Sequence, residues 1–228
     1  MNFNERYNRN MKTISQEDNK KLRDFKVCVI GCGGIGGYVI ELLGRLGIGT
    51  ITAVDGDIFD ITNLNRQLLS TEKLMGTSKA LAAKLRMAAI NSGVNLMPVV
   101  SFITPDNCEE IIAGHDIIVD ALDNISVRKL LEKNCEELNI PLVYGAIAGW
   151  YGYVSTIMPG DRTIEKLYPG EMEKGAEQEL GNPSFTPALV ASIEVAEIVK
   201  VLLGKGNILS KKLLTIDLLA QEYEICII

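Results

Sequence analysis

The stretch VCVIGCGGIGGYVIELLGRLG, residues 27–47, decides the fold class. An apolar run, a cluster of glycines and a segment with apolar residues at helical spacing predict a strand, a tight turn and a helix. The turn fills the spacing GxGxxG with Gly31, Gly33 and Gly36, and Gly34 adds a further glycine. Glycine lets the backbone turn sharply and approach a phosphate, and the helix N-terminus beyond it offers free N–H groups. We therefore expect a phosphorylated ligand at this turn.

Strand and helix patterns alternate along the first two thirds of the chain. Expected strands are Lys26–Ile30, Thr50–Val54, Asn95–Val100, Asp116–Asp120 and Leu142–Ala146. Helical patterns occupy Gly34–Leu46, Ser78–Asn91, Pro105–Ala113 and Asn124–Leu138. This alternation predicts an α/β, Rossmann-like fold, in which helices cover both faces of a mainly parallel central sheet.

The regular alternation of strand and helix patterns ends after Ala148. GWYGYVSTIM reads as one more strand, and the Gly-, Glu- and Pro-rich segment around 160–182 predicts a mobile loop. SFTPALVASIEVAEIVKVLLGKG predicts a helix that ends at Gly204, and KLLTIDLLAQEYEICII predicts two antiparallel C-terminal strands. We expect an N-terminal helical arm over residues 1–24 and a single domain over residues 25–228.

Composition restricts the possible classes of protein. The chain has 228 residues, 47% of them hydrophobic and 23% charged, as expected for a globular domain. Its net charge of −6 argues against a nucleic-acid partner. No apolar stretch reaches the roughly 18 residues that a membrane helix needs, and the polar N-terminus excludes a secretory signal.

The five cysteines form no CxxC pair and predict reduced residues of a cytoplasmic protein. They are Cys28, Cys32, Cys108, Cys135 and Cys226.

An acid and two cations follow the glycine turn. Asp55 ends the second strand about 20 residues beyond Gly36, where a ribose-binding acid belongs. On this motif alone, a nicotinamide cofactor and a mononucleotide are both possible. Asn63, Arg66 and Lys79 come next, and such groups suit chemistry at phosphorus, where negative charge builds in the transition state. The alternative is a solvated basic rim.

The segment VDALDN places two acids at the carboxyl end of a predicted strand. Asp120 ends that strand, and Asp123 and Asn124 follow it. Ligands of open α/β sheets bind beyond these strand ends. The Asp123 carboxylate can hold Mg²⁺, which prefers one or two carboxylates together with phosphate oxygens. Asn124 also fits the N-cap of the next helix, and helix capping or solvation is the alternative for Asp123.

These pieces carry a resemblance to a known family. The motifs VIGCGGIGG, DGDIFDITNLNRQ, GTSKA, DALDN and RYNRN are similar to those of the ThiF/MoeB/HesA family, the bacterial relatives of ubiquitin-activating enzymes. The resemblance runs from Arg6 to Gly204. It implies that residues 25–228 form an adenylation domain that binds ATP and Mg²⁺. Such proteins adenylate the C-terminal glycine carboxylate of a small ubiquitin-like sulfur-carrier protein that ends in Gly-Gly.

The resemblance also assigns roles to single residues. Asp55 would bind the ribose of ATP. Asn63, Arg66 and Lys79 would contact the phosphates, together with the glycine turn. Asp123 would hold the Mg²⁺.

Arg9, within RYNRN, matches an arginine that reaches the phosphates of the neighbouring subunit, which implies a homodimer. Attack of a carboxylate on the α-phosphate brings two anions together. Arg9, Arg66, Lys79 and Mg²⁺ would offset that charge and align the reactants. No general base is needed, because the carboxylate is already ionised near neutral pH.

The sequence departs from many relatives in two respects. Those relatives bind a structural zinc through two CxxC pairs, and this sequence has neither, so we expect no zinc. Several also carry a cysteine in the loop before the last helix, where this chain reads GEMEKGAEQELGNPSF. We therefore expect the chemistry to stop at the acyl-adenylate.

Four readings compete. The first is an adenylyltransferase for a sulfur carrier of thiamin or molybdopterin (or tungstopterin) biosynthesis. The second is ATP-dependent activation of a small carboxylate, as in tRNA threonylcarbamoyladenosine dehydratase, against which the acidic charge counts. The third is a non-catalytic partner of the carrier, which would need none of Asp55, Arg66, Lys79 and Asp123. The fourth is a nicotinamide oxidoreductase.

Overall fold

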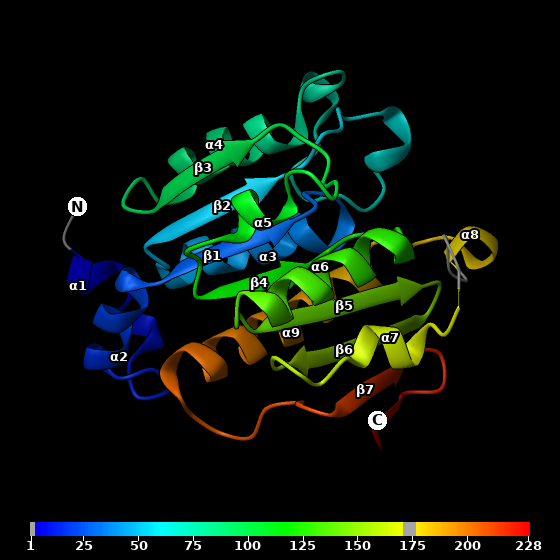
Figure 1. Ribbon diagram of the computed structural model, residues 1–228. Helices are drawn as coiled ribbons and strands as arrows, with labels where there is room; N and C mark the ends of the chain where they lie inside the picture. The colour runs from blue at the N-terminus through cyan, green and yellow to red at the C-terminus, as the bar shows by residue number, and fades with distance from the viewer. Residues whose placement is uncertain (1–2, 171–176) are drawn as a thin grey trace.

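A single eight-stranded sheet organises the chain, with strand order β3-β2-β1-β4-β5-β6-β7-β8 (Figure 1). The computed structural model describes residues 3–170 and 177–228. The first five strands are parallel, and β6, β7 and β8 are antiparallel to their neighbours. The strands are β1 (Lys26–Ile30), β2 (Thr50–Val54), β3 (Asn95–Val99), β4 (Ile117–Asp120), β5 (Leu142–Ala148), β6 (Tyr151–Ile157), β7 (Lys212–Asp217) and β8 (Glu222–Ile227).

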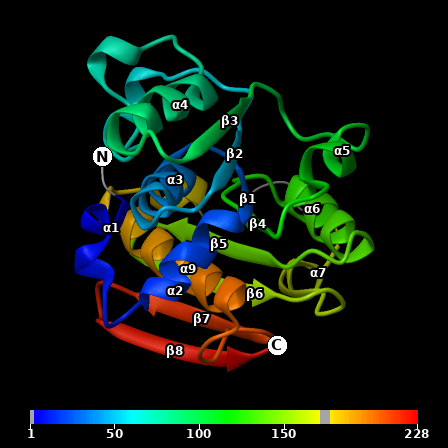
Figure 2. The same ribbon diagram turned by 90° about the vertical axis from the view of Figure 1, so that its left-hand side faces the viewer.

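Helices cover both faces of the sheet, which confirms the predicted fold class (Figure 2). One face carries α3 (Gly34–Leu46), α4 (Lys79–Ile90) and α9 (Phe185–Leu203), and the other carries α5 (Cys108–Ile112), α6 (Ile125–Glu137) and α7 (Thr163–Leu167). Successive β1 side chains point to opposite faces, so Val27 and Val29 join the first core, and Cys28 and Ile30 the second. Strands buried on both faces read as continuous apolar runs, which is why they were recognisable from sequence.

The chain reverses direction across the sheet between β1 and β4. It runs outward from β1 through β2 to β3, and then returns to β4 on the other side of β1. The loops after β1 and β4 therefore diverge, which opens a crevice at the carboxyl ends of these strands.

The N-terminal arm packs at the end of the parallel strands opposite this crevice. It consists of α1 (Phe3–Arg6), η1 (Asn8–Asn10), α2 (Gln16–Lys21) and η2 (Leu22–Asp24). Tyr7 is buried, and its hydroxyl accepts a hydrogen bond of 2.8 Å from the Asn91 side chain. A Cβ added to Gly47, just before β2, would lie 2.4 Å from the same hydroxyl. The arm thus lies at the amino-terminal ends of the parallel strands (Figure 1).

Some predicted boundaries were wrong. The helix expected at Pro105 begins only at Cys108, because the Asn107 side chain accepts a 2.8 Å hydrogen bond from the Thr104 N–H and holds residues 104–107 in a turn. The strand expected from Gly149 begins at Tyr151, since Gly149 adopts a φ of +57° in the turn after β5.

The described part of the predicted loop 160–182 contains two short helices, α7 and α8 (Glu177–Leu180). Residues 171–176 of that loop lie outside the described residues. Its mobility stays a prediction. Two further short 3-10 turns, η3 (Ile61–Asn63) and η4 (Glu72–Leu74), lie between β2 and α4.

Strand β8 forms the outer edge of the sheet. All six of its residues are exposed, and within the described part of the chain it pairs only with β7.

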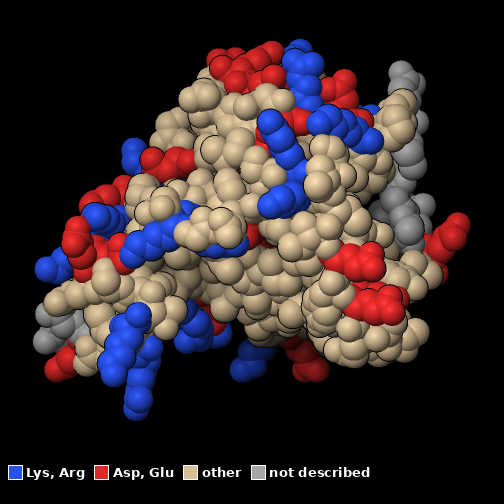
Figure 3. All heavy atoms as spheres, turned by 90° about the horizontal axis from the view of Figure 1, so that it is seen from below, with Lys and Arg blue, Asp and Glu red and all other residues tan. Residues whose placement is uncertain are grey.

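Seen from below the view of Figure 1, basic and acidic side chains are interspersed over the surface (Figure 3). Among the residues that the structure describes, no helix is both long and apolar enough to cross a membrane.

Candidate active site

A pocket of ≈ 240 Å³ opens at the crevice between the loops after β1 and β4. Its walls come from the glycine turn, the segments that follow β2, β3 and β4, the start of α4 and the carboxyl-terminal part of β5. Segments that are distant in sequence therefore meet at the carboxyl ends of the parallel strands. This is where an open α/β sheet binds its ligand.

The glycines of the turn serve two different purposes. Gly31 adopts a φ of +99°, and a Cβ there would lie 2.6 Å from the Ala121 carbonyl oxygen. A Cβ on Gly36 would lie 1.8 Å from the Gly31 carbonyl oxygen, so these two glycines permit close packing of turn, helix and strand. Gly33 and Gly34 line the pocket, and Gly33 is an N-cap without a side-chain cap. The N-terminus of α3 therefore remains open to an anion.

Asp55 links the glycine turn to the end of β2. One of its carboxylate oxygens accepts a 2.7 Å hydrogen bond from the Cys32 N–H, and the other accepts one of 2.8 Å from the Asp57 N–H. Burial raises the pKa of Asp55, and these hydrogen bonds together with the charge of Lys79 act in the opposite direction. The carboxylate lines the pocket, as its predicted role at a ribose requires.

Both predicted cations of the crossover line the pocket. Lys79 is the first residue of α4 and is buried, and its Nζ lies 3.1 Å from Oδ2 of Asp57. The Arg66 guanidinium donates 2.9 Å hydrogen bonds to the Thr62 carbonyl and to the Asn65 side chain. The reading as a solvated basic rim is therefore wrong for Lys79.

Asn63 and Arg9 lie outside the pocket lining. The Asn63 side chain accepts a 3.1 Å hydrogen bond from the Asp60 N–H and completes a capping box around η3. This contact accounts for an asparagine at this position without a ligand. Arg9 is exposed in η1 of the N-terminal arm. The arm lies at the amino-terminal ends of the parallel strands, whereas residues at their carboxyl ends line the pocket.

Asp123 lines the pocket beyond β4 and does not cap the next helix. That function belongs to Asn124, whose side chain accepts a 3.0 Å hydrogen bond from the Val127 N–H. Within the described residues, no group of three or more His, Cys, Asp or Glu side chains could hold a metal ion. A Mg²⁺ ion at Asp123 would thus rely on phosphate oxygens and water for its other ligands, as Mg²⁺ commonly does.

Two lining residues were missed in the sequence. Asp57 pairs with Lys79, and Gln67 is 6% exposed with an Oε1 atom that has no hydrogen-bond partner among the described residues. Such a buried acceptor fits a donor of a bound ligand or of water. Their positions in the sequence could have identified them, since Asp57 lies two residues after Asp55 and Gln67 directly follows Arg66.

The floor of the pocket contains a further cation, also missed. Arg128 of α6 is 5% exposed, and its Nη1 lies 3.5 Å from Oδ2 of the fully buried Asp120. The same nitrogen donates a 3.0 Å hydrogen bond to the Gly145 carbonyl, and Nη2 donates to the Leu122 carbonyl. The side chain therefore ties the ends of β4 and β5 together.

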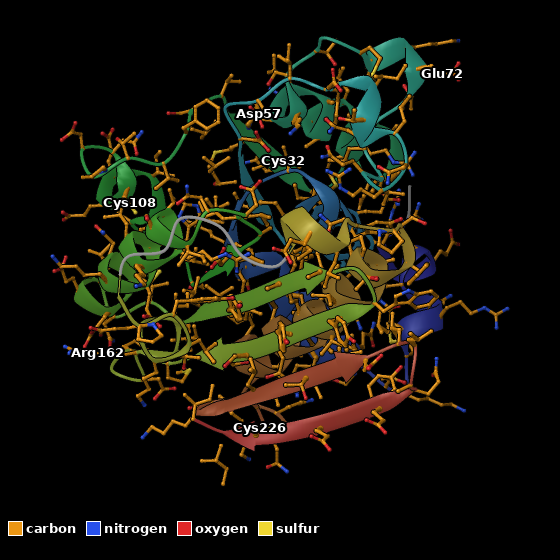
Figure 4. The ribbon with its side chains drawn as sticks, turned by 90° about the vertical axis from the view of Figure 1, so that its right-hand side faces the viewer. Cys32, Asp57, Glu72, Cys108, Arg162 and Cys226 are labelled. Carbon is orange, nitrogen blue, oxygen red and sulfur yellow. The ribbon has the colours of Figure 1, made fainter. Side chains whose placement is uncertain are left out.

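The thiols do not form a reactive centre at the pocket. All five cysteines are free, and four are buried. Burial raises the pKa of the Cys108 thiol to about 11 and shifts the pKa of Cys32 well above its usual value. The exposed Cys226 lies on β8, across the sheet from Asp57 (Figure 4). A nucleophilic cysteine needs a lowered pKa, which neither Cys32 nor Cys108 has.

The sequence matches known proteins over nearly its whole length. The model of the ThiF family matches residues 7–228. The chain is 33% identical over 225 residues to the SAMP-activating enzyme E1 of Haloferax volcanii, covering 96% of this chain and 83% of that protein. It is 34% identical over 230 residues to the sulfur carrier protein adenylyltransferase of Thermus thermophilus, covering 96% of this chain and 85% of that protein.

Solved structures share the fold. Escherichia coli MccB with ATP superposes with a TM-score of 0.84 at 23% identity, over 97% of this chain and 70% of that one. The E. coli tRNA N6-threonylcarbamoyladenosine dehydratase TcdA gives a TM-score of 0.75 at 24% identity, over 88% of this chain and 95% of that one.

Proposed function

The chain belongs to the ThiF family and is an adenylyltransferase, and we propose that it activates the C-terminal glycine carboxylate of a small ubiquitin-like sulfur-carrier protein as an acyl-adenylate. The carrier would end in Gly-Gly and serve thiamin or molybdopterin (or tungstopterin) biosynthesis. The observation that carries the proposal is one pocket that joins the uncapped N-terminus of α3 to Asp55, Arg66 and Lys79. The names of the H. volcanii and T. thermophilus relatives support a small protein as acceptor.

ATP would lie across the carboxyl ends of the strands. Asp55 would accept hydrogen bonds from the ribose hydroxyls, beside the turn that it already braces through the Cys32 N–H. The phosphates would lie at Gly33 and Gly34, where the α3 N-terminus supplies N–H donors. Arg66 and Lys79 line the same space and would bind the phosphate oxygens as cations. Asn63 would help only if its side chain left its capping contact.

The reaction is a displacement at the α-phosphorus. A carboxylate oxygen of the carrier forms a bond to that phosphorus, while the bond to the oxygen that bridges to the β-phosphate breaks and pyrophosphate leaves with the electron pair. No proton has to move. The residues of the pocket would therefore act by alignment and by stabilising negative charge, not as acid or base.

A Mg²⁺ ion fits the pocket beside Asp123, which lines it without a capping contact of its own. When bound, Mg²⁺ supplies positive charge to the phosphate oxygens as the pyrophosphate departs. Asp123 would hold it from the loop after β4. The Arg128 guanidinium anchors that loop through the Leu122 carbonyl.

A homodimer would bring Arg9 to the phosphates of the neighbouring subunit. Arg9 is exposed, and the arm that carries it packs at the amino-terminal ends of the parallel strands, whereas the pocket of the same chain lies at their carboxyl ends. A role at phosphate therefore requires a second copy of the chain. Residues 25–228 would form the adenylation domain and residues 1–24 the arm that reaches across.

The test is carrier-dependent exchange of labelled pyrophosphate into ATP. We expect exchange with a recombinant ubiquitin-like carrier that ends in Gly-Gly, and mass spectrometry should detect the carrier with one added AMP. The matched control is the same carrier without its last glycine, which should support neither signal. Exchange that does not depend on any carrier tested would contradict the proposed acceptor.

Activation of a small carboxylate on tRNA is the alternative, and the shared fold with TcdA is compatible with it. The same exchange assay separates the two. ATP consumption that requires tRNA bearing threonylcarbamoyladenosine, and no carrier protein, would favour this second function.

A further inference from the structure

Glu194 is a buried acid that the proposed mechanism does not use. It lies on α9 between Val190 and Ile198 of the buried face and is 0% exposed. Both of its carboxyl oxygens lack a hydrogen-bond partner among the described residues. A Cβ added to Gly145 would lie 2.4 Å from its Oε1, so the carboxyl group packs directly against the β5 backbone. An unpaired buried carboxyl group normally costs stability, and its presence therefore calls for an explanation.

The Gly145 backbone connects Glu194 to the pocket. The Gly145 carbonyl accepts the 3.0 Å hydrogen bond from Nη1 of Arg128, which also pairs with Asp120. Glu194, Gly145 and Arg128 thus form a continuous row of contacts from α9 to the pocket floor. The row ends at the Leu122 carbonyl, one residue before Asp123.

The charge around the pocket favours an uncharged Glu194. Among the described residues, three acids (Asp55, Asp57 and Asp123) and three cations (Arg66, Lys79 and Arg128) line the pocket, so their charges balance. The buried Asp120, whose Oδ2 lies 3.5 Å from Arg128, is a fourth acid beneath them. An ionised Glu194 would add a negative charge under a site that receives a triphosphate and a carboxylate. Burial, followed by the charge of Asp120, raises the pKa of Glu194 well above its usual value, while Arg128 acts against this shift.

We propose that Glu194 is a positioning residue, kept as an uncharged carboxylic acid, that fixes Gly145 and through it the Arg128 side chain at the floor of the pocket. Arg128, held in this way, fixes the loop that carries Asp123. Because Glu194 is uncharged, it adds no negative charge beneath the anionic substrates. The part of this inference that concerns substrates rests on the proposed function. The uncharged state of Glu194 does not.

Infrared spectroscopy tests the uncharged state without any substrate. We expect the difference spectrum between wild-type protein and Glu194→Gln, at neutral pH, to show the carbonyl stretch of one protonated carboxylic acid. Glu194→Gln keeps the shape of the side chain and cannot ionise. If the wild-type protein shows no such band, the inference is overturned, whatever the enzyme adenylates.

Binding of MgATP tests the positioning role. Glu194→Ala removes the contact with Gly145 and should weaken MgATP binding and raise the half-saturating Mg²⁺ concentration, each on the order of tenfold, as for outer-shell partners of metal ligands. Glu194→Gln should restore both values to within about twofold of the wild type, because it retains an uncharged group of the same shape. Equal loss in the two variants, or no loss in Glu194→Ala, would overturn the positioning role.

Glu197 of the same helix provides the matched control. It is also buried, but it faces away from the pocket, where it accepts hydrogen bonds from Thr156 and the Leu209 N–H and pairs with Lys200. Glu197→Gln should lower the melting temperature and leave MgATP and Mg²⁺ affinity unchanged. A wild-type protein that does not bind MgATP would contradict the proposed function, while the infrared result would still decide the state of Glu194.

Discussion

The ammonium of Lys79 lies 3.1 Å from the Asp57 carboxylate, at the point where α4 begins beside the glycine turn. The Lys79 side chain is nearly buried, whereas that of Asp57 is 55% exposed. The pair therefore holds a buried cation in place with an acid that can turn to solvent. A phosphate that enters the pocket can bind the Lys79 ammonium in place of Asp57. The Asp57 carboxylate then remains solvated, because its side chain is exposed.

Lys79→Met should lower carrier-dependent pyrophosphate exchange about 10²–10³-fold, the usual loss for one group that stabilises transition-state charge. Asp57→Asn should change exchange less than about tenfold, since this substitution removes only the resting partner of the lysine. Lys84→Met, which replaces an exposed lysine on the same helix and outside the pocket lining, is the control and should retain full activity. Equal losses in Lys79→Met and Lys84→Met would remove Lys79 from the mechanism.

Two glycine substitutions should separate packing from binding. Gly36→Ala places a methyl group 1.8 Å from the Gly31 carbonyl, so it should destabilise the fold by several kcal/mol, on the order of a strongly overpacked core site. Gly34→Ala meets only ordinary contacts, the nearest 3.7 Å away at Pro187, and should fold normally. Because Gly34 lines the pocket, the added methyl group should weaken ATP binding. Thermal unfolding and calorimetric titration with MgATP measure the two effects, and unimpaired binding by Gly34→Ala would argue against phosphates at this turn.

A heterodimer should reveal whether Arg9 acts across subunits. Arg9→Ala and Asp123→Ala should each be nearly inactive as pure proteins. When the two are co-expressed with different tags and the mixed dimer is isolated, one of its two sites has both residues intact, so about half of the wild-type activity should return. A mixed dimer as inactive as its parents would mean that Arg9 works within its own chain, whereas a fully active Arg9→Ala protein would mean that Arg9 has no role in the reaction. A monomeric wild-type protein would contradict the dimer itself.

Glu194 should give stability a defined dependence on pH. The pKa of Glu194 is raised in the folded state, so the folded protein keeps a proton that the unfolded chain releases above its ordinary pKa. The stability of the wild type relative to Glu194→Gln is therefore greatest at acidic pH and falls as the pH rises, by about 1.4 kcal/mol per pH unit until the folded-state pKa is reached. Urea unfolding of both proteins between mildly acidic and neutral pH measures this slope. A difference that stays constant with pH would mean that Glu194 is ionised in the folded protein.

The parallel half of the sheet could be predicted because its signals are local. A strand such as β1 is apolar on both faces, and the caps Ser78 and Asn124 mark the starts of α4 and α6 in the sequence. The glycine turn, Asp55 and Lys79 follow the same logic, since each stands next to the end of an element. Boundaries set by a single side-chain contact, such as that of Asn107 before α5, were missed.

The floor of the pocket was not predictable in the same way. Arg128 lies within α6 and Glu194 within α9, and only packing of these helices on opposite faces of β4 and β5 makes them neighbours of Asp120. One signal was present and was not used. Glu194 stands four residues from both Val190 and Ile198, so an acid interrupts an otherwise apolar helix stripe. Asn63 has two possible roles, since its motif position predicts a phosphate contact and its side chain also completes a local cap. The phosphate contact stays a prediction.

Within the described part of the chain, the outer strand β8 has N–H and C=O groups along one side of the sheet that are free to bond with another chain. This edge strand is prone to self-association because it exposes Tyr223, Ile225 and Ile227. Of its six residues, only Glu222 and Glu224 carry a charge that opposes edge-to-edge pairing of identical molecules. Concentrated preparations should therefore be kept at a pH well above the isoelectric point of about 5.0, because the net negative charge then makes the molecules repel one another and opposes β-strand-mediated aggregation through β8.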